Sequence, residues 1–504
     1  MRISLSKTTN PSSSFVFLLA DGAILSHHTL HRELTVEEQG HIKAFEYHTH
    51  LSGEYAHVIF LPTGRKALLF GIGAKPSHRK LLRTLRAAMQ TARTEKIKSL
   101  TFSFDDFLAG DHPSTPRLLN HAALAETLAT QAEMTNFEFT QYKTPPKEGW
   151  FSVEEVTFLS RGPKLHPQEI SRAIERGKII GEEANACRAL ANIPGGDMTP
   201  LKLFHAAQDA GTRCGFSVNA LDEKAMGKLR MGGILGVSKG SQEKPRFIIM
   251  EHLKGKMGEK PVVLIGKGVT FDTGGLNLKP GDSMSEMHMD MSGGAAVIHT
   301  IAALARLKVK KNIIGLVPAV ENMPSGSSYH PGDILRTMSG KTIEVLNTDA
   351  EGRIILADAL EYSKKYNPSL VIDIATLTGA SLSALGQRAS AMFSTSVEIA
   401  RKLQDTGEMV SDFVWPLPLW EEYEQEIQGT FGDVANLGKT RYGGAITGAV
   451  FLWQFIKEST DPKKQPPHWV HLDIAPRMTT IEGDFLAKGA AGAPVALLAT
   501  FLRQ

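Results

Sequence analysis

Cysteine is scarce in this sequence, with only Cys187 and Cys214 among 504 residues. Two cysteines cannot form a disulfide framework, so a reducing compartment is the simple inference. Long apolar runs are also missing. The best candidate near the N-terminus, residues 15–20, stops at the polar Asp21 and is too short for a secretory signal. No segment approaches the length of a membrane span. We therefore predict a cytoplasmic protein that does not enter a membrane.

An excess of charge of one sign is lacking as well. The 56 Lys and Arg residues nearly balance the 53 Asp and Glu residues, which leaves a formal net charge of +3. This balance does not indicate a surface that binds nucleic acid, although it is compatible with a local basic patch. A basic helix is expected at residues 79–93, and we interpret its charges as a solvated face, with an anion or RNA site as the alternative.

The chain is longer than one core usually organises, so two domains are expected. We predict the α/β fold class, with a smaller N-terminal domain at residues 1–165, a linking helix at 166–190 and a larger C-terminal domain at 191–504. In the first domain we expect strands at residues 14–20, 57–61, 67–73, 100–104 and 156–160, the second and third forming a hairpin, and helices at 79–93 and 118–131.

Strands and helices alternate along the second domain, which indicates a mainly parallel central sheet flanked by helices. The expected strands lie at residues 217–221, 246–251, 262–265, 312–317, 344–346, 370–374 and 469–474. The expected helices lie at residues 200–211, 294–307, 353–366, 399–407 and 444–459. We find no internal repeat and no low-complexity tract.

One heptapeptide stands out in this domain, Asn347-Thr348-Asp349-Ala350-Glu351-Gly352-Arg353. It lies between an expected strand end and an expected helix, where open α/β sheets form ligand sites. In extended backbone, residues two apart point the same way, so Asp349 and Glu351 can face one point and Arg353 can continue that edge. The alternative is a capped turn whose carboxylates stabilise the helix N-terminus.

A second stretch adds charged groups beside a buried strand. The apolar run 262–265 is followed by Lys267, Asp272 and Lys279, and then by Asp290 in a methionine-rich segment. Several carboxylates and lysines are costly to bury unless they neutralise one another or hold cations. Clusters of oxygen ligands suit divalent ions.

A nucleophile-elbow pattern at residues 236–240 competes with this interpretation. That motif needs a helix directly after it, whereas a polar turn at residues 241–245 follows here, so we interpret it as a chance match. The sequence contains no His-Glu-x-x-His, and its glycines at 266–275 have neither dinucleotide-loop nor phosphate-loop spacing.

The two stretches together resemble the signatures of the leucyl aminopeptidase family, also called the cytosol aminopeptidase or M17 peptidase family. The shared blocks are Gly-Lys-Gly-Val-Thr-Phe-Asp-Thr-Gly-Gly at residues 266–275 and the heptapeptide. Further resemblance runs through residues 373–380, 415–418 and 471–475. It covers roughly residues 185–504, and the N-terminal third matches only in general character.

The resemblance implies a catalytic C-terminal domain that holds two divalent ions, zinc or manganese. Asp272 and Glu351 would bridge the ions, Asp349 would complete one site, and Lys267 with Asp290 would complete the other. A lysine binds metal only as the neutral amine, so Lys267 should have a strongly lowered pKa when the ions are bound. The paired ions would lower the pKa of a shared water.

By the same resemblance, Lys279 stabilises the oxyanion and Arg353 holds a bicarbonate that serves as general base. Each lysine also has a plainer interpretation as a solvated surface charge. The pocket for the first substrate residue would be lined by Met287, Thr376, Leu377 and Gly379. Methionine is also a routine core residue, so Met287 has that alternative.

We therefore predict a metal-dependent aminopeptidase that removes N-terminal residues from peptides, prefers leucine-like residues and tolerates others. The family suggests a homohexamer. Two alternatives remain, a nucleic-acid-binding regulator and a metal-binding scaffold without activity.

Overall fold

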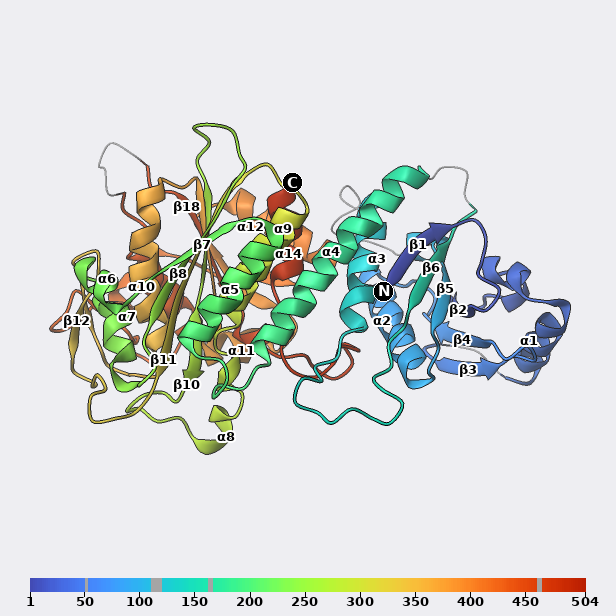
Figure 1. Ribbon diagram of the computed structural model, residues 1–504, viewed down its shortest axis with the longest axis horizontal. Coiled ribbons are helices and arrows are strands. Elements are labelled where there is room, and N and C mark those ends of the chain that lie inside the picture. The colour runs from blue at the N-terminus through green and yellow to red at the C-terminus, as the bar shows by residue number, and fades with distance from the viewer. Residues whose placement is uncertain (50–52, 110–119, 162–165, 460–464) are drawn as a thin grey trace. The chain divides into compact units, whose positions relative to one another are not determined.

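A computed structural model of the chain describes residues 1–49, 53–109, 120–161, 166–459 and 465–504 (Figure 1). The chain divides into two compact units. The first contains Met1–Asn185, Glu408–Ser411 and Ile481–Lys488, and the second contains Ala186–Gly407, Asp412–Thr480 and Gly489–Gln504. The predicted start of one helix, at residues 118–119, lies outside the described residues. Within the described ranges, no helix is long and apolar enough to cross a bilayer.

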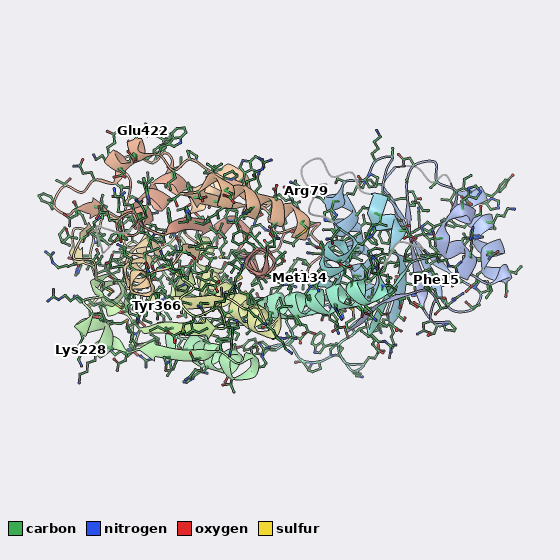
Figure 2. The ribbon with its side chains drawn as sticks, turned by 90° about the horizontal axis from the view of Figure 1, so that it is seen from above. Phe15, Arg79, Met134, Lys228, Tyr366 and Glu422 are labelled. Atoms are coloured by element: carbon green, nitrogen blue, oxygen red, sulfur yellow. The ribbon has the colours of Figure 1, made fainter. Side chains whose placement is uncertain are left out.

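The first unit is built on a six-stranded sheet in the order β1-β6-β5-β2-β4-β3. Its strands are β1 (Arg2–Ser6), β2 (Ser14–Leu19), β3 (Ala56–Phe60), β4 (Lys66–Gly71), β5 (Ser99–Ser103) and β6 (Glu155–Leu159). Neighbouring strands are parallel except for β3 and β4, which form the predicted antiparallel hairpin. β2 is buried along its whole length, and Phe15 lies among the side chains around this sheet (Figure 2).

Four helices accompany this sheet, α1 (Val36–His48), α2 (His78–Thr94), α3 (His121–Thr135) and α4 (Pro167–Ala191), the last continuing into the second unit. The basic helix α2 has the predicted solvated face in part, because Arg79 and Arg83 are exposed whereas Arg86 is buried. Arg86 is 5% exposed and donates to Gln131, and Arg79 donates to Glu408 at 2.7 Å. Arg86 is therefore a buried cation with a partner inside the unit, whereas Arg79 is paired but remains exposed to solvent.

A nine-stranded sheet organises the second unit. Eight strands follow the order β16-β15-β18-β14-β9-β11-β8-β7, and β10 pairs with the end of β11. The strands are β7 (Ser217–Leu221), β8 (Arg246–Leu253), β9 (Val262–Gly266), β10 (Gly268–Asp272), β11 (Asn312–Asn322), β14 (Leu370–Ala375), β15 (Ser390–Ser394), β16 (Val414–Pro416) and β18 (His468–Asp473). The central strands β18, β14, β9 and β11 are mutually parallel, and antiparallel pairs occur toward the edges. The predicted mainly parallel α/β class is confirmed.

A small sheet lies apart from the large one, with β12 (Ile334–Arg336), β13 (Thr342–Glu344) and β17 (Val434–Ala435). The predicted strand at 344–346 was placed too late, because β13 ends at Glu344. Beyond it, the Leu346 N–H bonds to the side chain of Asn436 instead of to a strand. The chain therefore leaves the sheet before the acidic heptapeptide begins.

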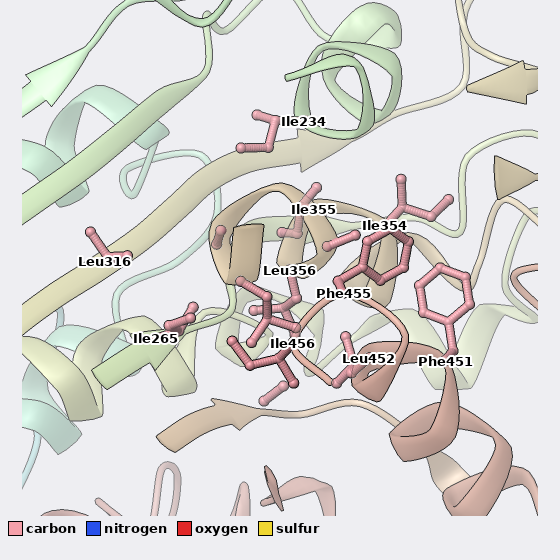
Figure 3. Packing of buried hydrophobic residues seen from close by; sticks show 14 of the residues in the cluster. Ile234, Ile265, Leu316, Ile354, Ile355, Leu356, Phe451, Leu452, Phe455 and Ile456 are labelled. Carbon is pink, nitrogen blue, oxygen red and sulfur yellow. The ribbon is translucent and has the colours of Figure 1, made fainter. Parts of the chain in front are cut away.

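The helices of this unit include α5 (Pro200–Cys214), α6 (Glu223–Lys228), α7 (Gly232–Val237), α8 (Gly281–Met284), α9 (Ser292–Arg306), α10 (Glu351–Ser363), α11 (Gly379–Leu385), α12 (Val397–Val410), α13 (Gly444–Trp453) and α14 (Val495–Arg503). A large apolar cluster joins α10 and the segment of α13 to the strands, with Ile354 and Phe451 among its members (Figure 3). This packing fixes the start of α10. The glycine pattern at 236–240 spans the end of α7 and a 3₁₀ turn, which fits a chance match.

Candidate metal site

The predicted metal ligands lie at the carboxyl ends of neighbouring strands and at two helix entrances. Lys267 directly follows β9, and its backbone N–H donates to the Ile374 carbonyl on β14 at 2.9 Å. Asp272 ends β10, and Glu351 is the first residue of α10. Asp290 follows a 3₁₀ turn just ahead of α9. Parallel strands present their carboxyl ends at one edge, so this topology gathers groups that are distant in sequence.

Three carboxylates form the centre of the site. Asp272, Asp290 and Glu351 each offer an oxygen, and these oxygens all lie within 4.8 Å of one another. The three residues are 2%, 3% and 1% exposed. Water therefore screens their mutual repulsion poorly, and nearby positive charge is needed.

Two lysines supply that charge. The Nζ of Lys267 lies 2.8 Å from Oδ2 of Asp290 and 2.9 Å from Oε1 of Glu351. The Nζ of Lys279 lies 2.9 Å from Oδ2 of Asp272 and also forms an ion pair with Asp349. The structure thus brings all five predicted metal ligands into one cluster that includes Lys279.

Burial and neighbouring charge shift the ionisation of these groups. Burial raises the pKa of Asp290 to about 8, although Lys267 opposes the shift. Burial and the charge of Glu351 raise the pKa of Asp272 to about 6. For Lys267, burial opposes the charged form, but Asp290 and Glu351 outweigh it and raise the pKa above its ordinary value. The carboxylates alone therefore hold Lys267 protonated, and the lowered pKa expected of a metal-binding lysine requires the cations themselves.

The donor set fits divalent cations. Carboxylate oxygens are hard ligands that only accept, and Oε2 of the buried Glu351 has no hydrogen-bond partner among the described residues. A buried carboxylate oxygen without a donor is unfavourable unless a cation contacts it. The unpaired oxygen therefore indicates where a metal ion would bind.

Arg353 is a second buried group with hydrogen-bond donors that lack acceptors in the described ranges. It lies in the first turn of α10 and is 5% exposed, and its Nε and Nη1 have no acceptor within the described part of the chain. Burial lowers the pKa of Arg353 to about 10, against the opposing charges of Glu351 and Asp473. A guanidinium with two unused donors suits a planar oxyanion.

Of the four predicted pocket residues, Met287 lies three residues before Asp290 in the chain, and Thr376 contacts the cluster through hydrogen bonds. Met287 is half-buried in the 3₁₀ turn before Asp290. Thr376 follows β14, its hydroxyl donates to Asp290, and its carbonyl accepts from Lys267 at 3.0 Å. The Leu377 N–H donates to Asp473 at 3.0 Å. A Cβ on Gly379 would meet no atom within 4 Å in the described ranges, so there is open space at this position.

The sequence did not reveal the amides that hold the heptapeptide. Asn436 accepts from the Leu346 N–H at 2.7 Å and donates to the Asn347 carbonyl at 2.6 Å. Asn277 accepts from the Thr348 N–H at 2.8 Å. Such contacts join residues about 70 to 90 positions apart, and a single sequence contains no pattern that would pair them.

Comparison with known proteins assigns the family. Residues 185–499 match the catalytic domain of the cytosol aminopeptidase family. The chain belongs to this family. The probable cytosol aminopeptidase of Azoarcus sp. (strain BH72) is 47% identical over 350 residues, which cover 69% of this chain and 67% of that protein. The probable cytosol aminopeptidase of Geobacter sp. (strain M21) is 38% identical over 452 residues, covering 89% and 87%.

A solved structure of similar fold is the bottromycin maturation enzyme BotP in complex with Mn. It has a TM-score of 0.79 and 26% sequence identity, and the match covers 98% of this chain and 99% of that one. The prediction of a metal-dependent aminopeptidase, a hydrolase, is confirmed by membership of the cytosol aminopeptidase family. Neither alternative, the nucleic-acid regulator or the inactive scaffold, is favoured by these relatives.

Proposed function

We propose that this cytosol aminopeptidase releases the first residue of peptides with a free N-terminus, using two divalent ions held by Lys267, Asp272, Asp290, Asp349 and Glu351. The observation that carries the proposal is the buried group of three carboxylates within 4.8 Å, one of whose oxygens lacks a partner among the described residues. Zinc or manganese would occupy the site, and the Mn complex of the similar BotP supports manganese.

Each ligand has a distinct contribution. Glu351 pairs with Lys267 and Asp272 with Lys279, and these two carboxylates would contribute to both ions, whereas Asp349 would serve one and Asp290 the other. Bound divalent ions would supply Lewis acidity, lowering the pKa of a water and polarising the scissile carbonyl. Lys267 would hold an ion only as the neutral amine, because only that form has a free electron pair.

Two positively charged side chains, Lys279 and Arg353, would assist the hydrolysis. Lys279 keeps its charge, because its carboxylate neighbours Asp272 and Glu351 outweigh burial and raise its pKa. It can therefore stabilise negative charge that develops on the substrate oxygen. Arg353 would bind bicarbonate through Nε and Nη1 and so position a proton acceptor near Glu351.

Substrate preference should follow the pocket at Met287, Thr376, Leu377 and Gly379. The open space at Gly379 means that this position places no steric limit on the first side chain of the substrate. One methylene is worth only about 1–3 kcal/mol in an apolar pocket, so broad tolerance is expected. A cytoplasmic location, supported by the free Cys187 and Cys214 and by the relatives' names, and a homohexameric assembly also belong to this proposal.

Hydrolysis of leucine amide tests the function directly. We expect activity that a chelator removes and that Zn²⁺ or Mn²⁺ restores, with two ions per chain by elemental analysis and no hydrolysis of N-acetyl-leucine amide. Glu351→Gln should abolish metal binding. Glu361→Gln, a change in the same helix at a residue paired with Lys364, should not. Full activity in metal-free protein would refute the proposal.

A further inference from the structure

Asn322 has no assigned role, yet it forms hydrogen bonds to Asp272 and to the turn that carries Asp349. It is the last residue of β11, it is 0% exposed, and it pairs in register with Asp272 at the end of β10. Its backbone carbonyl accepts from the N–H of Thr273 at 3.1 Å and from the Thr273 hydroxyl at 2.7 Å. The backbone of Asn322 is therefore fixed against the strand that carries Asp272.

The amide nitrogen of Asn322 spans two parts of the site. Nδ2 donates to Oδ1 of Asp272 at 2.9 Å and to the Thr348 carbonyl at 2.9 Å. Both partners are oxygens that accept only, so the opposite orientation of the amide would face its own oxygen toward two acceptors. The contacts therefore determine the orientation of the amide and use both of its hydrogens.

These bonds decide which oxygen of Asp272 can bind a cation. Oδ1 accepts from Asn322 and also from the Gly274 N–H at 2.9 Å. A carboxylate oxygen has about two acceptor positions, and both are now used. Oδ2 remains, and it is the oxygen that Lys279 contacts at 2.9 Å. Asp272 thus presents a single oxygen to the site.

The second bond of the amide fixes the heptapeptide. Thr348 directly precedes Asp349, and its carbonyl also accepts from the hydroxyl of the buried Tyr329 at 2.8 Å. Asn322 therefore connects the carboxylate on β10 to the turn that carries Asp349 and Glu351, whereas Tyr329 bonds only to the turn.

We propose that Asn322 is a positioning residue that orients Asp272 so that Oδ2 alone faces the cations and holds Asp272 in register with the Asp349 turn. This inference rests on the proposed metal-dependent function. Removing a group that orients a metal ligand typically weakens metal binding by 10- to 100-fold. We expect that loss here, because a free Asp272 could rotate and the turn could move away from it.

The test measures Mn²⁺ affinity by calorimetry on chelator-treated full-length protein. Asn322→Ala removes both hydrogen bonds. Asn322→Asp keeps the shape but places a carboxylate against two oxygens. Tyr329→Phe is the matched control, because it removes only the bond to Thr348. We expect roughly 10- to 100-fold weaker Mn²⁺ binding for both Asn322 variants and a several-fold smaller effect for Tyr329→Phe.

Melting temperature and the active fraction are recorded for each variant, because a purely structural role lowers these without changing the Mn²⁺ affinity of the folded protein. Wild-type affinity in either folded Asn322 variant would overturn the inference, as would an equal loss in Tyr329→Phe. If one Asn322 variant does not fold, the Mn²⁺ affinity of the other variant tests the inference. A wild-type chain that binds no Mn²⁺ and no Zn²⁺ would instead refute the proposed function, so the two failures are distinguishable.

Discussion

The hydroxyl of Thr376 donates to Oδ1 of Asp290 across 2.6 Å. The carbonyl of the same residue accepts from Nζ of Lys267 at 3.0 Å. Thr376 therefore contacts two proposed ligands of one metal ion, although the sequence suggested only a place in the substrate pocket. The proposed substrate pocket and the proposed metal site would therefore share this residue.

Two substitutions of Thr376 should separate these roles. Thr376→Val keeps the branched shape but removes the hydroxyl donor, so Mn²⁺ affinity should fall by roughly 10-fold. Thr376→Ser keeps the hydroxyl and should retain wild-type affinity, while its smaller side chain changes the ratio of kcat/KM between leucine amide and alanine amide. Calorimetry and steady-state kinetics provide the two measurements. Wild-type Mn²⁺ affinity in Thr376→Val would show that the hydroxyl has no part in binding.

Metal affinity should rise with pH between about 6 and 8. The raised pKa values of Asp272 and Asp290, about 6 and about 8, mean that protons compete with cations for these carboxylates below those values. Lys267 must also release a proton to bind metal. Competition with a coloured chelator across this range measures the affinity, and calorimetry in buffers of different ionisation enthalpy counts the protons released. An affinity that does not vary with pH would contradict this linkage.

Lys279→Ala should keep both metal ions and lose about 10²- to 10³-fold in kcat, the usual effect of removing a group that stabilises an oxyanion. Lys279 contacts Asp272 and Asp349 but is not itself among the proposed ligands. The metal content, from elemental analysis, and kcat are compared with those of the control variant Lys364→Ala. Lys364 pairs with Glu361 elsewhere on the chain. Loss of metal in proportion to activity would show that the role of Lys279 is misassigned.

Gly352→Ala should leave the chain folded but weaken its metal binding. A Cβ at this position would lie 2.5 Å from Cε of Lys267, whose flexible side chain would have to move out of the site. Alanine itself favours a helix over glycine by about 1 kcal/mol, so α10 should not be destabilised. Gly227→Ala in α6 is the control, because its Cβ would meet no atom within 4 Å in the described ranges. Equal Mn²⁺ affinity in both variants would contradict the prediction.

Apolar runs and their spacing were sufficient to predict most central strands. β9 is a continuous apolar segment and β14 is apolar except for Asp373, as expected for strands buried on both faces. β10 was not predicted, because Gly268 and the charged Lys267 interrupt the apolar pattern directly after β9. Its pairing with the far end of β11 is a long-range contact. Helix α10 begins two residues earlier than predicted, at Glu351, and Ala350 gives no capping signal.

The candidate ligands were predicted from the resemblance to the two signature blocks of the family, since the carboxylates and lysines by themselves indicated only a cation or close pairing. The supporting amides were not predictable. Asn322 lies 50 residues from Asp272 and Asn436 lies 90 residues from Leu346. Asparagine is common in loops and at strand ends, so neither residue carried a signal before the fold brought it to the heptapeptide.

The pairing of Lys267 and Lys279 with the site carboxylates affects the order in which the chain folds and binds metal. In the metal-free chain the two ammonium groups offset part of the negative charge of the carboxylates. A newly synthesised chain can therefore complete its fold first and acquire metal afterwards. The supply of ions in its surroundings then determines when it becomes active.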